Sequence, residues 1–311
     1  MNWFGNAHLH NCYILVLINK EQIMPAPNGL RTFDVAPSPT TGGARPEQTA
    51  QRLTLLQLTD PHLFAEPDGQ LLGVTTRRSF EAVLELALAH SPPADALVLT
   101  GDLVHDESRE GYRALRRLLD RTGLPYYCIP GNHDSQPLME ELLGPAALGP
   151  VAVRTLGDWN LVFLDSTEPG REGGRIGQAR LAALGDALVA KRSPAVIFLH
   201  QHPIPVQSAW MDRLSVEDGD ELIALCNRHH QVKALVCGHV HQEFAQRLDG
   251  YWVLGTPSTC VQFEPRQSKF AIDAQPPGYR ELTLLANGAL ETRVVRLDGY
   301  PERPSRTAGG Y

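Results

Sequence analysis

The sequence predicts an α/β protein, and three observations carry that prediction. Short apolar runs alternate with stretches whose apolar residues recur at helical spacing. Several runs stop at a Gly that is followed by a polar residue, as buried strands do before a turn. With 311 residues, 42% of them hydrophobic and 20% charged, the chain is long enough for one large α/β domain.

The first 51 residues differ from the remainder. Much of this segment is rich in Pro, Gly, Thr and Ala and has little apolar periodicity. We expect residues 1–51 to form a disordered extension, in which Met24 offers an alternative start. No composition shift or fixed-period repeat interrupts the chain after it, so we expect one domain over residues 52–311.

The next part of the chain alternates strands with helices. The strands are short apolar runs that end in polar residues, and the helices carry Leu, Val and Phe on one face. This alternation predicts βαβ units and an α/β sheet. The expected elements are, in order, a strand at 53–58, a helix at 76–90, a strand at 96–102, a helix at 107–121 and a strand at 126–129.

The same alternation continues and then changes. The hairpin turns at 248–250 and 286–288 indicate that the last part of the chain is rich in antiparallel strands. The expected elements are a strand at 161–165, a helix at 178–191, a strand at 195–199, a helix at 217–230, a strand at 232–237 and a β-rich segment at 252–297.

Five of the predicted strands end in notable polar residues. Strands of one sheet bring their ends together, so we expect these residues to converge. Within Asp60-Pro61-His62 and within His239-Val240-His241 an extended backbone would point both outer side chains the same way. Pro61 favours that extended geometry at Asp60. The strand-end residues are Asp60, His62, Asp102, Asn132, His133, His200, His239 and His241.

These side chains are typical ligands of borderline divalent metals. Imidazoles, carboxylates and an amide together suit Fe, Mn, Zn or Co better than Ca or Mg alone. Up to four of these imidazoles, the two carboxylates and the amide make seven ligands, which are too many for one catalytic ion that keeps an open position. They suit two ions if one carboxylate bridges them.

Bulk properties exclude some partners. The net charge of −7 gives no basic excess for nucleic acid, and no apolar run approaches the roughly 18 residues of a membrane span. The five cysteines are widely spaced and contain no CxxC, which favours a reducing cytoplasm.

With these residues in hand, the chain resembles the calcineurin-like metallophosphoesterase superfamily, over roughly residues 52–311. Within it, the chain is most similar to the bacterial class III 3′,5′-cyclic AMP phosphodiesterases, and the run at 256–263 narrows the resemblance to that group. The blocks that carry the resemblance are Asp60-Pro61-His62, Gly101-Asp102, Gly131-Asn132-His133-Asp134, His200 and Gly238-His239-Val240-His241.

The resemblance implies a fold and a ligand set. The fold would be a four-layer sandwich of two mixed β-sheets flanked by helices. Asp102 would bridge two ions, with iron or manganese favoured and zinc or cobalt as alternatives. The first ion would also be held by Asp60, His62 and His241, and the second by Asn132, His200 and His239.

The resemblance also implies hydrolysis of 3′,5′-cyclic AMP to 5′-AMP. His133 would stabilise charge or protonate the leaving oxygen, next to Asn132. The phosphate would lie against His62, Asp102, Asn132, His133 and His241. The alternatives are another small phosphodiester as substrate, glycerol- or nucleotide-linked, or a metal-binding scaffold without catalysis.

Three local alternatives stay open at this stage. His202 is the alternative to His200 as a ligand, because the family often has three consecutive histidines there. Asp134 either orients His133 or forms a turn. Trp210 either lines a nucleobase pocket or anchors a loop in the core, and for Cys260 packing is the default.

Overall fold

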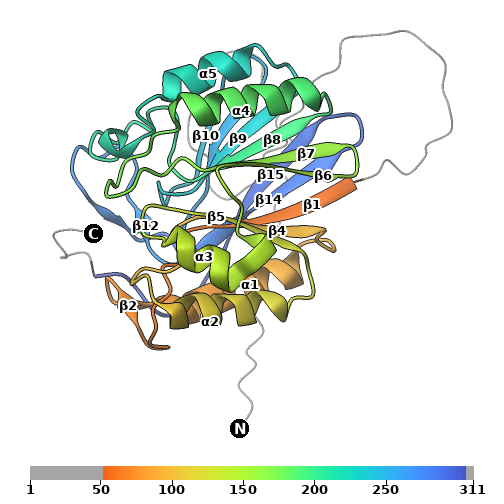
Figure 1. Ribbon diagram of the computed structural model, residues 1–311. Helices are drawn as coiled ribbons and strands as arrows, with labels where there is room; N and C mark the ends of the chain where they lie inside the picture. Colours follow the sequence, from red (N-terminus) through yellow and green to blue (C-terminus); the bar gives the residue numbers. More distant parts are fainter. Residues whose placement is uncertain (1–51, 306–311) are drawn as a thin grey trace.

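The computed structural model describes residues 52–305, and the disorder predicted for residues 1–51 lies outside them. The described chain forms four layers, in which two β-sheets lie between two groups of helices (Figure 1). One outer layer holds α1 (Thr76–His90), α2 (Arg109–Asp120) and α3 (Gln136–Leu143), and the other holds α4 (Gly177–Ala190) and α5 (Gly219–Asn227).

The first sheet is mixed and has the order β15-β14-β1-β4-β5. Its parallel half contains β1, β4 and β5, whereas β14 and β15 run antiparallel to their neighbours. Its strands are β1 (Arg52–Leu58), β4 (Ala96–Thr100), β5 (Tyr126–Ile129), β14 (Gly278–Leu285) and β15 (Leu290–Arg296).

The second sheet is also mixed and has the order β10-β11-β9-β8-β7-β6. Its middle strands are parallel and its two edge strands are antiparallel to their neighbours. Its strands are β6 (Val151–Leu156), β7 (Trp159–Leu164), β8 (Ala195–Leu199), β9 (Val232–Cys237), β10 (Phe244–Arg247) and β11 (Trp252–Gly255).

Short elements complete the described chain. Two small ribbons pair β2 (Gln70–Leu71) with β3 (Val74–Thr75) and β12 (Gln262–Phe263) with β13 (Ile272–Asp273). Two 3₁₀ turns are η1 (Gly144–Ala146) and η2 (Asp212–Leu214).

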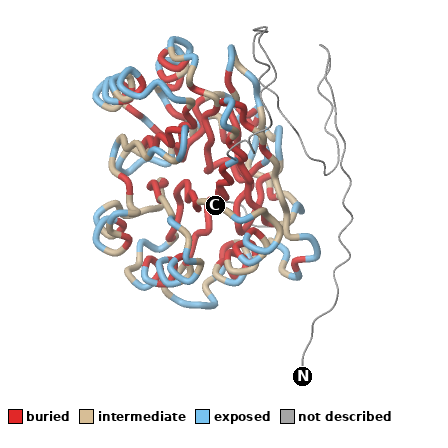
Figure 2. Tube along the Cα trace, turned by 90° about the vertical axis from the view of Figure 1, so that its right-hand side faces the viewer, coloured by how far each residue is buried: buried red, intermediate tan, exposed pale blue. Residues whose placement is uncertain are grey.

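The alternating directions of strand side chains explain the layers. In β1, Leu53 and Leu55 pack between the two sheets, whereas Leu56 and Leu58 pack against the helices. Both faces of the sheet are therefore buried, which is why leucines occupy both faces of β1. Figure 2 shows this buried interior, with exposed residues along the outer helices. The four-layer sandwich implied by the resemblance is confirmed.

Two predicted helices are shorter in the structure, and a local cap explains where the first of them begins. The helix predicted at 107–121 begins at Arg109, because the Ser108 side chain accepts a hydrogen bond from Gly111 N at 3.1 Å. The helix predicted at 217–230 covers only Gly219–Asn227. The carboxylate before it, Asp218, is bound to the backbone N–H groups of Ile176 and Gly177.

Within residues 52–305 no helix combines the length and the apolar character needed to cross a lipid bilayer. The cysteines of this region, Cys128, Cys226, Cys237 and Cys260, are free and buried.

Candidate metal centre

The predicted site residues lie in five loops that follow β1, β4, β5, β8 and β9. From the sequence we expected these strands to belong to one sheet, but they do not. The first three belong to the first sheet and the last two to the second. The loops meet because the two sheets pack face to face and their parallel strands end on the same side. The site is therefore assembled across the sandwich.

One cluster consists of Asp60, His62 and His241, which are fully buried. His241 Nε2 lies 3.2 Å from Asp60 Oδ1 and 3.4 Å from His62 Nε2. His241 Nδ1 donates to the Val261 carbonyl at 2.8 Å, so the Nε2 atom of the neutral ring carries a lone pair. A lone pair that faces a carboxylate and a second imidazole needs a positive charge between them.

A second cluster consists of Asp102, His200 and His239. His200 Nδ1 donates to the Thr100 carbonyl at 2.7 Å, and its Nε2 lies 3.3 Å from Asp102 Oδ1 and 3.2 Å from Asn132 Oδ1. His239 Nε2 is buried and has no hydrogen-bond partner among residues 52–305. Here too the groups that converge are mainly acceptors.

Asp102 lies between the two clusters. Its Oδ1 faces His200, and its Oδ2 lies 3.6 Å from His62 Nε2. Burial opposes ionisation, but contact with His200, and more weakly with His62, holds the pKa of Asp102 well below its usual value. Asp102 is therefore a carboxylate placed between imidazoles of both clusters.

The imidazoles respond to these surroundings in different ways. Burial lowers the pKa of His62 and of His239 well below the usual value. Burial also disfavours the charged form of His200, but the Asp102 carboxylate outweighs it and raises the pKa of His200 to about 9. A proton on His200 thus supplies charge that a metal cation would supply in its place.

The backbone of the site is not extended, and that part of the sequence prediction is wrong. Five of the predicted ligands have positive φ: Asp60 (52°), His62 (45°), Asp102 (51°), His239 (63°) and His241 (47°). Backbone hydrogen bonds hold this conformation, among them Asp60 N to Gly101 O at 3.1 Å and His62 N to Asp102 O at 2.9 Å. Left-handed conformations of this kind concentrate at functional sites, where the surrounding fold maintains them.

The glycines before the ligands have the role that the sequence indicated. A Cβ on Gly131 would overlap Asp102 Oδ1, and a Cβ on Gly101 would overlap His200 Nδ1. Gly101 also has a φ of 93°, which side chains rarely adopt. The absent side chains let the strand-end loops approach closely enough for their ligands to meet.

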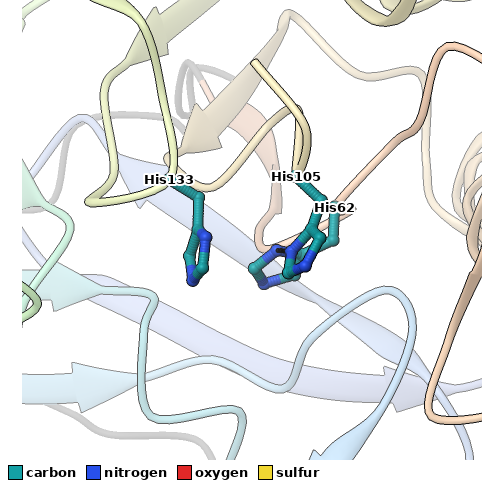
Figure 3. Close-up of side chains that lie close together, drawn as sticks. All are labelled: His62, His105 and His133. Carbon is teal, nitrogen blue, oxygen red and sulfur yellow. Dashed lines mark hydrogen bonds between the residues drawn. The ribbon is translucent and has the colours of Figure 1, made fainter. Parts of the chain in front are cut away.

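His133 lies at the edge of the clusters and is half-buried. Its backbone N–H donates to Asp102 Oδ1 at 3.0 Å. Its ring is edge-on to that of His62, with centroids 5.1 Å apart, and stacks on that of His105, with centroids 4.8 Å apart (Figure 3). His133 is thus held beside the ligands through both its backbone and its ring.

His105 is the residue that the sequence analysis missed. With His62 and His133 it forms a third group with convergent donor atoms. Its position three residues after Asp102, in the same strand-end loop, could have indicated it. The sequence analysis looked for two ligands at positions i and i+2, and His105 has no such partner.

The contacts of Asp134 agree with the turn-forming alternative. The Asp134 carboxylate accepts from the backbone N–H groups of Leu103, Val104 and Gly131 and from the Tyr112 hydroxyl, as expected of a loop-forming aspartate. Burial and the nearby Asp102 raise the pKa of Asp134 to about 7.

Trp210 is buried and packs edge-on against Phe263 and Phe270, which agrees with a core anchor. Cys260 is 3% exposed in the same apolar cluster. Packing, the default for Cys260, therefore fits its surroundings.

His202 does not enter either cluster. Its ring stacks on that of His239 with centroids 5.8 Å apart, and its Nε2 is 3.8 Å from Asp212 Oδ1. Both ring nitrogens are buried without a hydrogen-bond partner among the described residues. His200, by contrast, faces Asp102 and Asn132, so the geometry favours His200 over His202 as the ligand.

The donor set fits divalent cations. Each cluster joins imidazole nitrogens to a carboxylate in a buried space, and the two carbonyl acceptors at Thr100 and Val261 orient imidazole Nε2 atoms inward. Acceptor groups that face one another in a buried space are stable when a cation lies between them.

Comparisons with known proteins show which family this chain is similar to. A family model described as calcineurin-like phosphoesterase matches residues 53–243. The chain is 40% identical over 261 residues to the 3′,5′-cyclic adenosine monophosphate phosphodiesterase CpdA of Vibrio vulnificus, with 83% of this chain and 95% of that protein covered. It is 38% identical to the CpdA protein of Escherichia coli K12, with 84% and 95% covered.

The fold is also similar to that of a dimetal phosphatase from Danio rerio, with a TM-score of 0.54 and 16% identity, over 78% of this chain and 98% of that one. At this identity the likeness concerns the fold alone. The family match, by contrast, covers more than half of the chain and includes every predicted ligand. The chain therefore belongs to the calcineurin-like phosphoesterase family.

Proposed function

We propose that this protein is a metal-dependent phosphodiesterase that hydrolyses 3′,5′-cyclic AMP to 5′-AMP and so lowers the intracellular concentration of cyclic AMP. The observation that carries the proposal is the similarity to CpdA proteins over 95% of their length, at 38–40% identity. The convergence of two His/Asp clusters supports the metal dependence.

The proposed ligands follow the two clusters. Asp102 contacts imidazoles of both clusters, which supports its assignment as the ligand that the two ions would share. Iron or manganese is the favoured metal, and zinc or cobalt also suits mixed nitrogen and oxygen donors. The first ion is assigned to Asp60, His62 and His241, and the second to Asn132, His200 and His239.

When bound, the two ions supply Lewis acidity for the phosphoryl oxygens and for the attacking water. The chain supplies orientation and proton transfer. His133 donates a proton to the leaving 3′ oxygen or stabilises its charge. Its backbone bond to Asp102 and its stacking on His105 support a fixed ring position at the edge of the clusters. The phosphate is proposed to contact His62, Asp102, Asn132, His133 and His241.

The proposal includes a cytoplasmic location and no nucleic-acid or membrane partner. Buried free cysteines among residues 52–305 and a net charge of −7 support these parts of it. A substrate phosphate would then be attracted by the local charge of the site and not by the whole surface.

The test is hydrolysis by the metal-reconstituted chain. Protein loaded with Mn²⁺ or Fe²⁺ is incubated with 3′,5′-cyclic AMP, and the product is identified by chromatography. We expect 5′-AMP, and a marked preference for cyclic AMP over glycerophosphodiesters and a generic aryl phosphodiester. Equal rates on all these substrates would favour the broader phosphodiesterase, and metal binding without any hydrolysis would favour the scaffold.

A further inference from the structure

His105 lies outside the proposed ligand set, but a nitrogen of its ring contacts a ligand imidazole directly. The Nδ1 atoms of His62 and His105 lie 3.2 Å apart (Figure 3). On the opposite side of the His62 ring, Nε2 lies 3.6 Å from Asp102 Oδ2 and 3.4 Å from His241 Nε2. The His62 ring therefore connects the interior of the site to His105.

The other two ligand histidines with a known Nδ1 partner use a backbone carbonyl. His200 Nδ1 donates to Thr100 O and His241 Nδ1 donates to Val261 O. A carbonyl only accepts, so it fixes the tautomer with the lone pair on Nε2. His62 has an imidazole at that position, and an imidazole fixes the same tautomer only if its own Nδ1 accepts.

The fold holds His105 in place for such a role. Its backbone N–H donates to Leu63 O at 2.8 Å, next to the parallel bridge between Leu63 and Val104. Its ring stacks on that of His133 and lies 5.0 Å, between centroids, from that of Phe64. The acceptor atom is thus positioned by backbone pairing on one side and by ring packing on the other.

We propose that His105 is a positioning residue for the metal centre. It accepts the Nδ1 proton of His62 on its own Nδ1 and so holds the His62 Nε2 lone pair toward Asp102 and His241. This inference rests on the ligand assignment of the proposed function. Removal of the partner that orients a ligand imidazole lowers metal affinity by about 10–100-fold.

The consequence is confined to one of the two ions. His62 belongs to the cluster with Asp60 and His241, whereas the ring of His200 is oriented independently by Thr100. Loss of the His105 acceptor is therefore expected to weaken the ion held by His62 and to leave the other ion unchanged.

Two substitutions separate the acceptor from the ring. His105→Phe keeps a planar ring that stacks on His133 but places a C–H group where Nδ1 was. His105→Asn removes the ring but places an acceptor oxygen, Oδ1, at the equivalent position on the side chain. His230→Phe, at an exposed histidine far along the sequence, is the matched control.

The experiment measures the binding of Mn²⁺ to metal-free protein by titration calorimetry, with thermal unfolding as the check on folding. We expect wild type and His230→Phe to bind two ions alike. His105→Phe should bind one ion about 10–100-fold more weakly, and His105→Asn should stay within about threefold of wild type.

Wild-type affinity for both ions in His105→Phe would overturn the inference, and so would an equal loss in His105→Asn and His105→Phe. Either result would leave the proposed function intact if the wild type hydrolyses cyclic AMP. A wild type that binds fewer than two ions would overturn the ligand assignment and this inference together.

Discussion

The conversion of Asp102 to Asn removes one charge from the centre of the site and little else. The Asp102 side chain is 1% exposed, and its Oδ1 accepts from the His133 backbone N–H at 3.0 Å. The amide oxygen of Asn can still accept this hydrogen bond. The loop that carries His133 is therefore expected to stay in place. What is lost is the negative charge shared between His62 and His200.

The magnitude follows from Coulomb's law. Two unit charges about 4 Å apart interact by about 4 kcal/mol at an effective dielectric constant of about 20. Since about 1.4 kcal/mol corresponds to tenfold in affinity, the loss of one carboxylate charge should weaken cation binding by about a thousandfold. For a doubly charged ion this is a lower bound, and a carboxylate shared by two ions should affect both of them.

The assay is competition for Mn²⁺ between the metal-free protein and a chromophoric chelator, followed by measurement of the metal content. Asp165→Asn is the matched control. That carboxylate is also buried at a strand end, but it contacts donors: Gln136 Nε2 at 2.8 Å, Thr167 N at 2.8 Å and Arg180. Asp165→Asn should lower stability without changing metal affinity. Two tightly bound ions in Asp102→Asn would refute the bridging assignment.

Four other outcomes are expected. His133→Ala should keep both ions and lower turnover about 10²–10⁴-fold, because the backbone bond to Asp102 survives; unchanged turnover would remove His133 from the reaction. Gly131→Ala should lower the free energy of unfolding by about 1–3 kcal/mol and weaken metal binding, because the added methyl group overlaps Asp102. Gly149 has open space around it, so Gly149→Ala should change neither quantity. Denaturant titration measures the free energy of unfolding of the two variants. Removal of the metal by a chelator should lower the melting temperature, and refilling at about 1,000 times the Kd should restore about 4 kcal/mol; an unchanged melting temperature would argue against structural coupling of the ions. Burial raises the pKa of three thiols to about 12, those of Cys226, Cys237 and Cys260. Alkylation of the native protein at pH 8, mapped by mass spectrometry, should therefore spare them, and rapid labelling would contradict this expectation.

The sequence was most informative where a local signal was abrupt. The strands that end at Ile129, Leu199 and Cys237 have the predicted bounds, because an apolar run gives way at once to Pro, His or Gly. The strand β6 and the helix α3 (Gln136–Leu143) were not predicted. β6 is only half-buried along its length, and α3 has just eight residues, so neither gives a clear apolar pattern.

The division of the strands between two sheets could not be derived from local pattern. β14 pairs with β1 although more than 200 residues separate the paired positions in the sequence; Leu282, for example, lies opposite Leu55. Such pairing depends on packing across the whole sandwich, and only the resemblance to a known family indicated two sheets. The positive φ values of Asp60 and His62 escaped prediction for a related reason, because neighbouring loops impose them through hydrogen bonds from Asp60 N and His62 N.

The charge of the site explains how an acidic protein can act on an anion. Among the seven proposed ligands only Asp60 and Asp102 carry formal negative charge, since the others are imidazoles and an amide. The two proposed divalent ions would bring four positive charges, so the filled centre would keep about two of them. A phosphodiester is therefore attracted by the centre in spite of the net charge of −7 of the chain. Without the ions the same pocket presents two carboxylates and one protonated imidazole, that of His200, so its net charge is negative and the attraction is lost. Substrate binding should for this reason depend on metal loading even before any chemistry occurs.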